Sequence, residues 1–220
     1  MNAILKPVSP ELCEKVISGE CTLLLSKTRP KLETPFKEYI YCTKGKEVLV
    51  TNKVVSWTGE VIGEFVCDRI DEYRTEFYED EETYQEIREV WLDEDYDYPV
   101  EDYKIITTNE RENPNDCKLL KNACLTFNEV KKYVGYGDGK FCSLHISDLK
   151  IYDKPKELGE NGDFKFPCVR GGEDFDSHRK CVGCKYARLW TGTKEIYCDR
   201  WVTRAPQSWC YVEELEVCGE

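Results

Sequence analysis

The stretch that decides the fold is SPELCEKVISGECTLLLS, residues 9–26, in which a short helix runs directly into a strand. Ser9 is a favoured N-cap residue, and Pro10 occupies the first helical position, where its missing N–H costs little. Apolar residues then recur at the spacing of one helix face until Gly19, a typical C-terminal stop. The apolar run that follows predicts a strand over residues 22–25.

Further strands are predicted where β-branched and aromatic residues alternate with polar ones. These runs cover residues 38–42, 47–50, 61–70 and 141–152. A second short helix is predicted over residues 126–135, where Thr126 and Glu129 form a capping-box pattern and Gly135 ends the helix. Two short helices among many strands predict an α+β, mainly β fold, namely a small β-barrel with short flanking helices.

The 220 residues suffice for one large domain, or for one domain with a small appendage, and 40% of them are apolar. No run approaches the roughly 18 consecutive apolar residues of a membrane span. The first residues also lack the pattern of a secretory signal. We therefore expect a cytoplasmic protein with no membrane partner, whose 13 cysteines are reduced thiols or metal ligands.

The net charge of −12 is distributed unevenly along the chain. Residues 1–57 carry nine basic and six acidic side chains, whereas residues 68–113 carry eighteen acidic and five basic ones. We predict a solvated acidic insertion that covers about residues 72–113 and contains one helix over residues 83–92. The alternative is an acidic surface that imitates DNA or binds a host protein, as in an accessory or anti-defence factor. The N-terminal part is mildly basic, so the overall charge does not exclude binding to nucleic acid.

Four stretches carry a resemblance to a known family. They are the first helix with SGECT (residues 18–22), VIGEFVC (61–67), HISDLKIY (145–152) and PQSWCYV (206–212). These stretches resemble the ASCH domains of the PUA-like superfamily, and in particular the ASCH-like proteins of phages and prophages. The resemblance implies a pseudo-barrel over residues 1–152 with a cleft beside the first helix. In the family such a cleft takes RNA or modified nucleotides.

The chain departs from the family where catalysis is expected. The usual pattern after the first helix is Gly-x-Lys-x-x-Glu-x-Arg, and one branch hydrolyses acetylated cytidine with a lysine, a threonine and a glutamate. Here the glycine is kept, but Cys21, Leu24 and Ser26 stand at the Lys, Glu and Arg positions. Thr22 and Glu64 remain as catalytic candidates, with Cys21 as a thiol nucleophile. Because the lysine is missing, we expect a non-catalytic binding module for RNA or a modified nucleotide; a hydrolase acting on a modified base is the alternative.

Spaced basic residues follow the strand at residues 22–25. Cations close to aromatic side chains are the ingredients of a groove that tracks phosphates and stacks bases. We therefore predict a nucleic-acid-binding groove, with an ordinary solvated loop as the alternative. Its candidate residues are Lys27, Arg29, Lys31, Tyr41, Lys44 and Trp57.

The C-terminal part contains the strongest metal-binding pattern. Cys181 and Cys184 are separated by two residues, so both thiolates can bind one ion, and Cys168 and Cys198 can complete a tetrahedral set that suits structural zinc. Unligated or disulfide-bonded cysteines and an iron–sulfur cluster are the alternatives. His178 or Cys210 can replace one ligand. The predicted organisation is thus a barrel over residues 1–152, a Cys-rich segment over 153–203 and a return strand of the barrel over 204–216.

Overall fold

The computed structural model describes most of the chain. The described residues are 3–44, 48–50, 53–55, 59–77, 85–93, 100–108, 117–135, 139–159, 162–166, 187–189, 196–198 and 200–214. Among them, no helix is long and apolar enough to cross a membrane.

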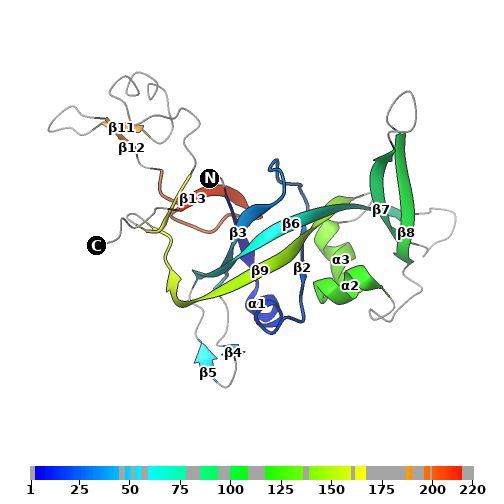
Figure 1. Cartoon of the computed structure of the whole chain (residues 1–220), viewed down its shortest axis with the longest axis horizontal. Helices are drawn as coiled ribbons and strands as arrows, with labels where there is room; N and C mark the ends of the chain where they lie inside the picture. Colours follow the sequence, from blue (N-terminus) through cyan, green and yellow to red (C-terminus); the bar gives the residue numbers. More distant parts are fainter. Residues whose placement is uncertain are drawn as a thin grey trace.

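The core of the molecule is an open, mixed β-sheet (Figure 1). Its strands, in spatial order, are β10 (Phe164–Lys165), β13 (Cys210–Glu214), β1 (Ala3–Val8), β3 (Phe36–Cys42), β6 (Glu60–Phe77), β9 (Lys140–Lys156) and β2 (Leu23–Ser26). Strands β1 and β3 are parallel, and the other neighbours in this series are antiparallel. The predicted class, mainly β with short flanking helices, is confirmed.

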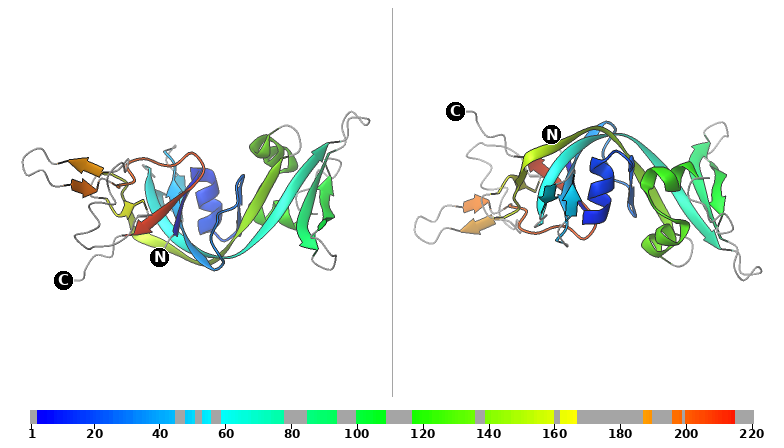
Figure 2. Two further views of the ribbon diagram at one scale, coloured as in Figure 1. Left: turned by 90° about the horizontal axis from the view of Figure 1, so that it is seen from above. Right: turned by 90° about the horizontal axis from the view of Figure 1, so that it is seen from below.

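Helix α1 (Pro10–Ile17) lies within the curve of the sheet (Figure 2). Its ends form as the sequence predicts: the Ser9 side chain accepts a hydrogen bond from the Leu12 N–H, and Gly19 has a φ of +78°. The buried side chains Cys13 and Val16 pack in a cluster with residues of β1, β2, β3, β6 and β9. This packing, rather than the propensity of eight residues, stabilises the helix.

Two contacts bring the open edges of the curved sheet together. The Lys31 N–H donates to the Tyr211 hydroxyl over 2.8 Å. The Trp209 indole N–H donates to the Thr28 carbonyl oxygen over 3.2 Å and to the Thr28 hydroxyl over 3.0 Å. The loop after β2 therefore meets the segment around the start of β13 through side chains, which gives the sheet the form of a pseudo-barrel.

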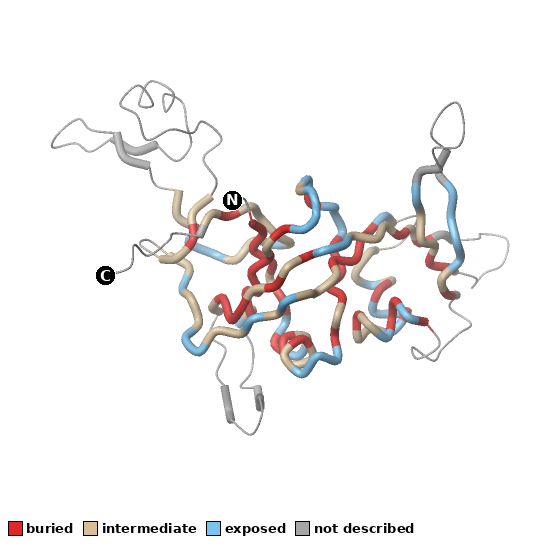
Figure 3. The backbone as a smooth tube through the Cα atoms, viewed as in Figure 1, coloured by how far each residue is buried: buried red, intermediate tan, exposed pale blue. Residues whose placement is uncertain are grey.

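Strands β6 and β9 continue beyond the pseudo-barrel, where two further strands extend the same sheet. There β6 pairs with β7 (Gln85–Asp93), which pairs with β8 (Val100–Thr108). Helices α2 (Lys118–Ala123) and α3 (Phe127–Val134) pack on this part, and their apolar cluster includes Ile87 and Phe141. Both hydrogen bonds of the predicted capping box of α3 are present. Figure 3 shows burial concentrated in the central strands and exposure along β8.

The helix expected over residues 83–92 is wrong, because this segment contains strand β7. The spacing of its apolar residues also suits a strand that contains an irregularity, and the pairing with β8 shifts register between Ile87 and Arg88. Pairing with β6 and β8 on its two sides satisfies the backbone of β7, and this tertiary pairing overrides the local pattern. Strands β1 and β8 and helix α2 were not anticipated from the sequence.

Two small hairpins complete the described elements. Strand β4 (Val48–Val50) pairs with β5 (Lys53–Val55), and β11 (Ala187–Leu189) pairs with β12 (Ile196–Cys198). The predicted zinc ligands Cys168, Cys181 and Cys184 lie outside the described residues, and Cys198 is described only as the last residue of β12. The zinc site therefore stays a prediction.

Candidate functional site

A pocket of about 500 Å³ opens beside α1. Residues from the end of β1, the start of α1, β2, the loop after β2, α3 and the segment before β13 line it. These residues are Lys6, Pro7, Val8, Ser9, Leu12, Leu24, Leu25, Lys27, Leu125, Glu129, Tyr133, Gln207 and Ser208. We call this cavity the α1 pocket. Its volume is in the range of small-molecule sites, and its walls are mainly apolar, as is common for such sites.

Lys6 is the most buried cation of the α1 pocket. It belongs to β1, where it shares a face with Ile4 and Val8, both of which pack in the apolar cluster around α1. The side chain is only 5% exposed, yet it lines the pocket. Burial lowers the pKa of the Lys6 amine below its ordinary value, and the charge of Glu38 offsets part of that effect. A protonated amine in this position is costly unless a polar group approaches it.

Glu38 lies on the neighbouring parallel strand, on the same face as Lys6. The register pairs Ile4 with Glu38 and Lys6 with Ile40, so Lys6 and Glu38 are diagonal neighbours. The Glu38 side chain is fully buried, and neither carboxylate oxygen has a hydrogen-bond partner among the described residues. Burial raises the pKa of this carboxyl to about 7, although the charge of Lys6 acts in the opposite direction. The interior thus holds two titratable groups whose pKa values are shifted toward each other.

The mouth of the α1 pocket combines a cation with an aromatic ring. The Lys27 amine stands 5.4 Å from the centre of the Tyr133 ring, and the Tyr133 hydroxyl donates to the Leu25 carbonyl oxygen over 3.3 Å. The capped helix α3 therefore holds the ring beside β2. The Ser208 hydroxyl also lines the pocket, and its buried oxygen has no hydrogen-bond partner among the described residues. A ligand in the pocket can therefore contact both the Lys27 amine and the Ser208 hydroxyl.

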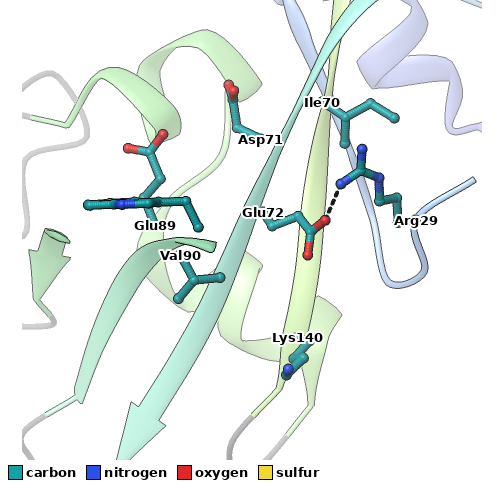
Figure 4. A pocket seen from close by; sticks show the side chains of 8 residues that line it. Arg29, Ile70, Asp71, Glu72, Glu89, Val90 and Lys140 are labelled. Carbon is teal, nitrogen blue, oxygen red and sulfur yellow. Dashed lines mark hydrogen bonds and ion pairs between the residues drawn. The ribbon is translucent and has the colours of Figure 1, made fainter. Parts of the chain in front are cut away.

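The other predicted cations of this loop, Arg29 and Lys31, do not line the α1 pocket. Arg29 forms an ion pair with Glu72 and lines a separate hollow of about 490 Å³ against β6 and β7 (Figure 4). Asp71, Glu72 and Glu89 line that hollow together with Lys140. Lys31 does not line either of these two cavities. Of the three spaced cations in this loop, the structure brings only Lys27 to the α1 pocket.

Two further candidates, Tyr41 and Lys44, do not line the α1 pocket. Tyr41 is 7% exposed and packs in the apolar cluster that includes Phe164 and Val212. Lys44 lies close to Gly59, as does the Tyr41 hydroxyl. Trp57 lies outside the described residues. The nucleic-acid groove over all six candidates stays a prediction, and the described residues favour a smaller site that keeps Lys27.

The catalytic candidates do not converge on the α1 pocket. The Cys21 thiol is buried, donates to the Leu23 carbonyl oxygen over 3.2 Å, and has its pKa raised to about 12 by burial. Thr22 uses its backbone N–H to bond the Asn122 carbonyl oxygen over 2.8 Å. None of Cys21, Thr22 and Glu64 lines the pocket.

Glu64 belongs to a different set of contacts. Its carboxylate accepts a hydrogen bond from the Tyr152 hydroxyl over 2.5 Å and one from the Lys37 amine over 3.2 Å. Burial alone would raise the pKa of Glu64, but these two hydrogen bonds together with the charges of Lys37 and Lys150 outweigh it and hold the pKa below the ordinary value. Tyr152 and Lys37 therefore hold the Glu64 carboxylate in place.

The sequence carries a signal for Lys6 and Glu38. Both are charged residues on the apolar side of a strand, in the alternations Ile4-x-Lys6-x-Val8 and Phe36-x-Glu38-x-Ile40. A charge at such a position needs a partner or a ligand. Tyr133, in contrast, reaches the pocket only because α3 packs beside β2, which no local pattern reveals.

Comparisons with known proteins return solved structures alone. No family model and no curated protein matches the chain. A crystal structure of ASCH from Zymomonas mobilis is 12% identical and aligns over 96% of this chain and 87% of that chain, with a TM-score of 0.41. A mutant of the same protein is also 12% identical and aligns over 96% of this chain and 90% of that chain, with a TM-score of 0.40. The chain is thus similar, over nearly its whole length and at low identity, to solved ASCH structures.

Proposed function

We propose that this protein binds RNA or a modified nucleotide in the α1 pocket. The observation that carries the proposal is the position of the Lys27 amine over the Tyr133 ring at the mouth of an apolar cavity of about 500 Å³. A nucleotide combines a flat ring, which an aromatic side chain can stack, with a phosphate, which a lysine can neutralise. The cavity has room for a single nucleotide rather than for a duplex.

The interior of the pocket supports recognition of the polar edge of a base. The Lys6 amine can donate to a carbonyl oxygen of the ligand, and the Ser208 hydroxyl can donate or accept. Both groups are buried, so a ligand that leaves them unpaired is disfavoured. Selection among bases would come from these two groups, and affinity from the apolar walls and Lys27.

Hydrolysis of a modified base has less support from the described residues. Cys21 is buried away from the pocket, and Glu64 is tied to Tyr152 and Lys37. We therefore place binding before catalysis.

A second candidate function is the docking of a partner protein on strands β7 and β8, which we call the β7–β8 ribbon. The partner would present a basic surface to it. Tyr103 and Ile105 lie on one face of β8 and are 49% and 48% exposed, within the most acidic part of the chain. Exposed apolar residues rimmed by charge are typical of interaction surfaces. Its test is a double substitution, Tyr103→Ser with Ile105→Ser, which should abolish binding to a basic partner and leave nucleotide binding unchanged.

The test of the main proposal is calorimetric titration of the full chain with nucleosides, nucleoside monophosphates and short single-stranded RNAs. Lys27→Gln should weaken binding of a monophosphate about tenfold, the equivalent of roughly 1.4 kcal/mol. The matched control is Lys31→Gln, in the same loop, which should leave the affinity unchanged because that side chain does not line the pocket. Leu12→Trp should block the cavity from the α1 side. Unaltered binding in Leu12→Trp would overturn the proposal.

A further inference from the structure

Lys6 has the surroundings of a reactive amine. It lies 5% exposed among Val8, Leu12 and Leu24, and still lines a cavity that a small molecule can enter. Its amine donates no hydrogen bond to another described residue. Burial lowers its pKa, so a larger fraction of the amine is uncharged near neutral pH than for an exposed lysine. An uncharged amine in an apolar pocket is nucleophilic.

A carboxyl group lies diagonally across from this amine on the neighbouring strand. Glu38 is the diagonal neighbour of Lys6 on β3, is fully buried, and has two carboxylate oxygens without a hydrogen-bond partner among the described residues. Cys142 on β9 is the other titratable group that acts on Lys6, and burial raises the pKa of its thiol to about 11, which keeps it neutral. The proposed binding of a nucleotide uses the Lys6 amine as a hydrogen-bond donor. It gives no role to the Glu38 carboxylate.

We propose that Lys6 is a nucleophile that forms an imine with a phosphorylated aldehyde bound in the α1 pocket. The Lys6 nitrogen attacks the carbonyl carbon, and the electron pair of the C=O bond moves to oxygen. Glu38 takes one proton from the nitrogen and passes it to the oxygen, which gives a neutral carbinolamine. The remaining N–H proton then moves by way of Glu38 to the departing hydroxyl, so that water leaves and a neutral C=N bond remains. Amine and aldehyde give imine and water, with no other reactant.

The mouth of the pocket selects the class of aldehyde. Lys27 can bind a phosphate while Tyr133 covers a ring or sugar, so the ligand carries a phosphate and an aldehyde within one nucleotide-sized unit. This step rests on the proposed function, because it uses the same pocket and the same phosphate contact. Two sources offer this chemistry: a free phosphorylated aldehyde, and the open-chain sugar at an abasic position of a nucleic-acid strand.

The experiment traps the imine in the full chain. The protein is incubated with pyridoxal 5′-phosphate near neutral pH, reduced with borohydride and mapped by peptide mass. We expect an adduct at Lys6 to form before one at the exposed Lys154, and to be absent in Lys6→Met. A second arm uses a single strand with one abasic position and cyanoborohydride. A covalent band in the wild-type chain that is missing in Lys6→Met identifies the strand as a source, whereas labelling by pyridoxal phosphate alone identifies the free aldehyde.

Further variants separate this inference from the proposed function. Glu38→Gln should slow adduct formation at Lys6 without weakening the binding of 4-deoxypyridoxine 5′-phosphate, which lacks the aldehyde. If this analogue binds and Lys6 acquires no adduct, imine formation is excluded and the binding pocket stands. If neither compound binds, both proposals fall. Equal labelling of Lys6 and Lys154 also overturns the inference, and that comparison is made within one wild-type chain, so it does not depend on the folding of a variant.

Discussion

Glu38 couples the stability of the fold to pH. Burial raises the pKa of its carboxyl from 4.5 to about 7, so the folded chain holds this proton more tightly than the unfolded chain. The stabilisation from this proton is therefore complete below about pH 4.5 and is lost as the pH rises through about 7. Relative to Glu38→Gln, the free energy of unfolding of the wild-type chain should fall with pH in this interval, by up to about 1.4 kcal/mol per pH unit.

Urea unfolding of both chains between about pH 5 and about pH 8 measures this difference. The other carboxyl groups contribute equally to both curves, so they cancel in the comparison. Parallel curves for the two chains would show that Glu38 ionises normally in the folded state.

Cys21 is expected to have no catalytic role. Its pKa of about 12 leaves almost no thiolate near neutral pH, and the thiolate is the nucleophilic form. The chain should not turn over acetylated cytidine at roughly 1 per second, the low end of ordinary enzymes, in an assay followed by chromatography. Cys21→Ala should lower the free energy of unfolding by about 1 kcal/mol and leave nucleotide affinity unchanged. Turnover that disappears in Cys21→Ala would contradict this prediction.

Two isoleucines on adjacent strands test which face of the β7–β8 ribbon is buried. Ile87 of β7 is 1% exposed and packs against α2 and α3, whereas Ile105 of β8 is 48% exposed. Ile87→Ala should lower the free energy of unfolding by about 2–4 kcal/mol, because it leaves a cavity in the packed layer. Ile105→Ala should change it by less than about 0.5 kcal/mol. Denaturant unfolding of the two variants is the measurement, and equal effects would contradict the ribbon's orientation.

Local signals predicted the elements that carry their own caps. Ser9 with Pro10 marks α1, and Thr126 with Glu129 marks α3; in both cases the signal lies within four residues of the helix start. The segment of β7 was predicted as a helix because the spacing of its apolar residues fits a helix equally well. Its pairing with β6 and β8 makes it a strand. Strand β1 was missed because Pro7 and Lys6 interrupt its apolar pattern. Its pairing with β13 ends at Leu5, so Pro7 requires no hydrogen-bond partner on that side.

The candidate site depends on tertiary packing more than the local elements do. The predicted groove placed Arg29 and Lys31 together with Lys27, although Arg29 forms an ion pair with Glu72 in another hollow. These three cations occupy every second position of a loop, and only tertiary packing decides which cavity each one lines. Lys6 and Glu38 are 32 positions apart in the chain and meet only through the parallel pairing of β1 with β3.

For the whole molecule, we predict that the Cys-rich segment binds about one zinc ion per chain through Cys168, Cys181, Cys184 and Cys198. A short polar segment gains order from a metal, so removing zinc with a chelator should lower the melting temperature. Cys181→Ser should lower both the zinc content and the melting temperature. The matched control is Cys124→Ser, a half-buried thiol at the end of α2, which should leave the zinc content intact. Elemental analysis that finds no metal in protein purified without chelator would rule the site out.

The separation of charge along the chain should orient a bound RNA strand. The acidic part, residues 68–113, includes β7, β8 and the end of β6. Phosphates are therefore expected to avoid that end and to approach the α1 pocket from the side of Lys27. Each lost phosphate contact reduces the salt dependence of binding to a single strand by roughly 0.7 in log–log slope. Lys27→Gln should show this reduction. Arg29→Gln should not, because Glu72 already offsets the charge of Arg29 in a separate hollow. Titrations of a short single-stranded RNA at several salt concentrations provide the slopes, and a larger reduction for Arg29→Gln than for Lys27→Gln would move the strand from the α1 pocket to the ribbon.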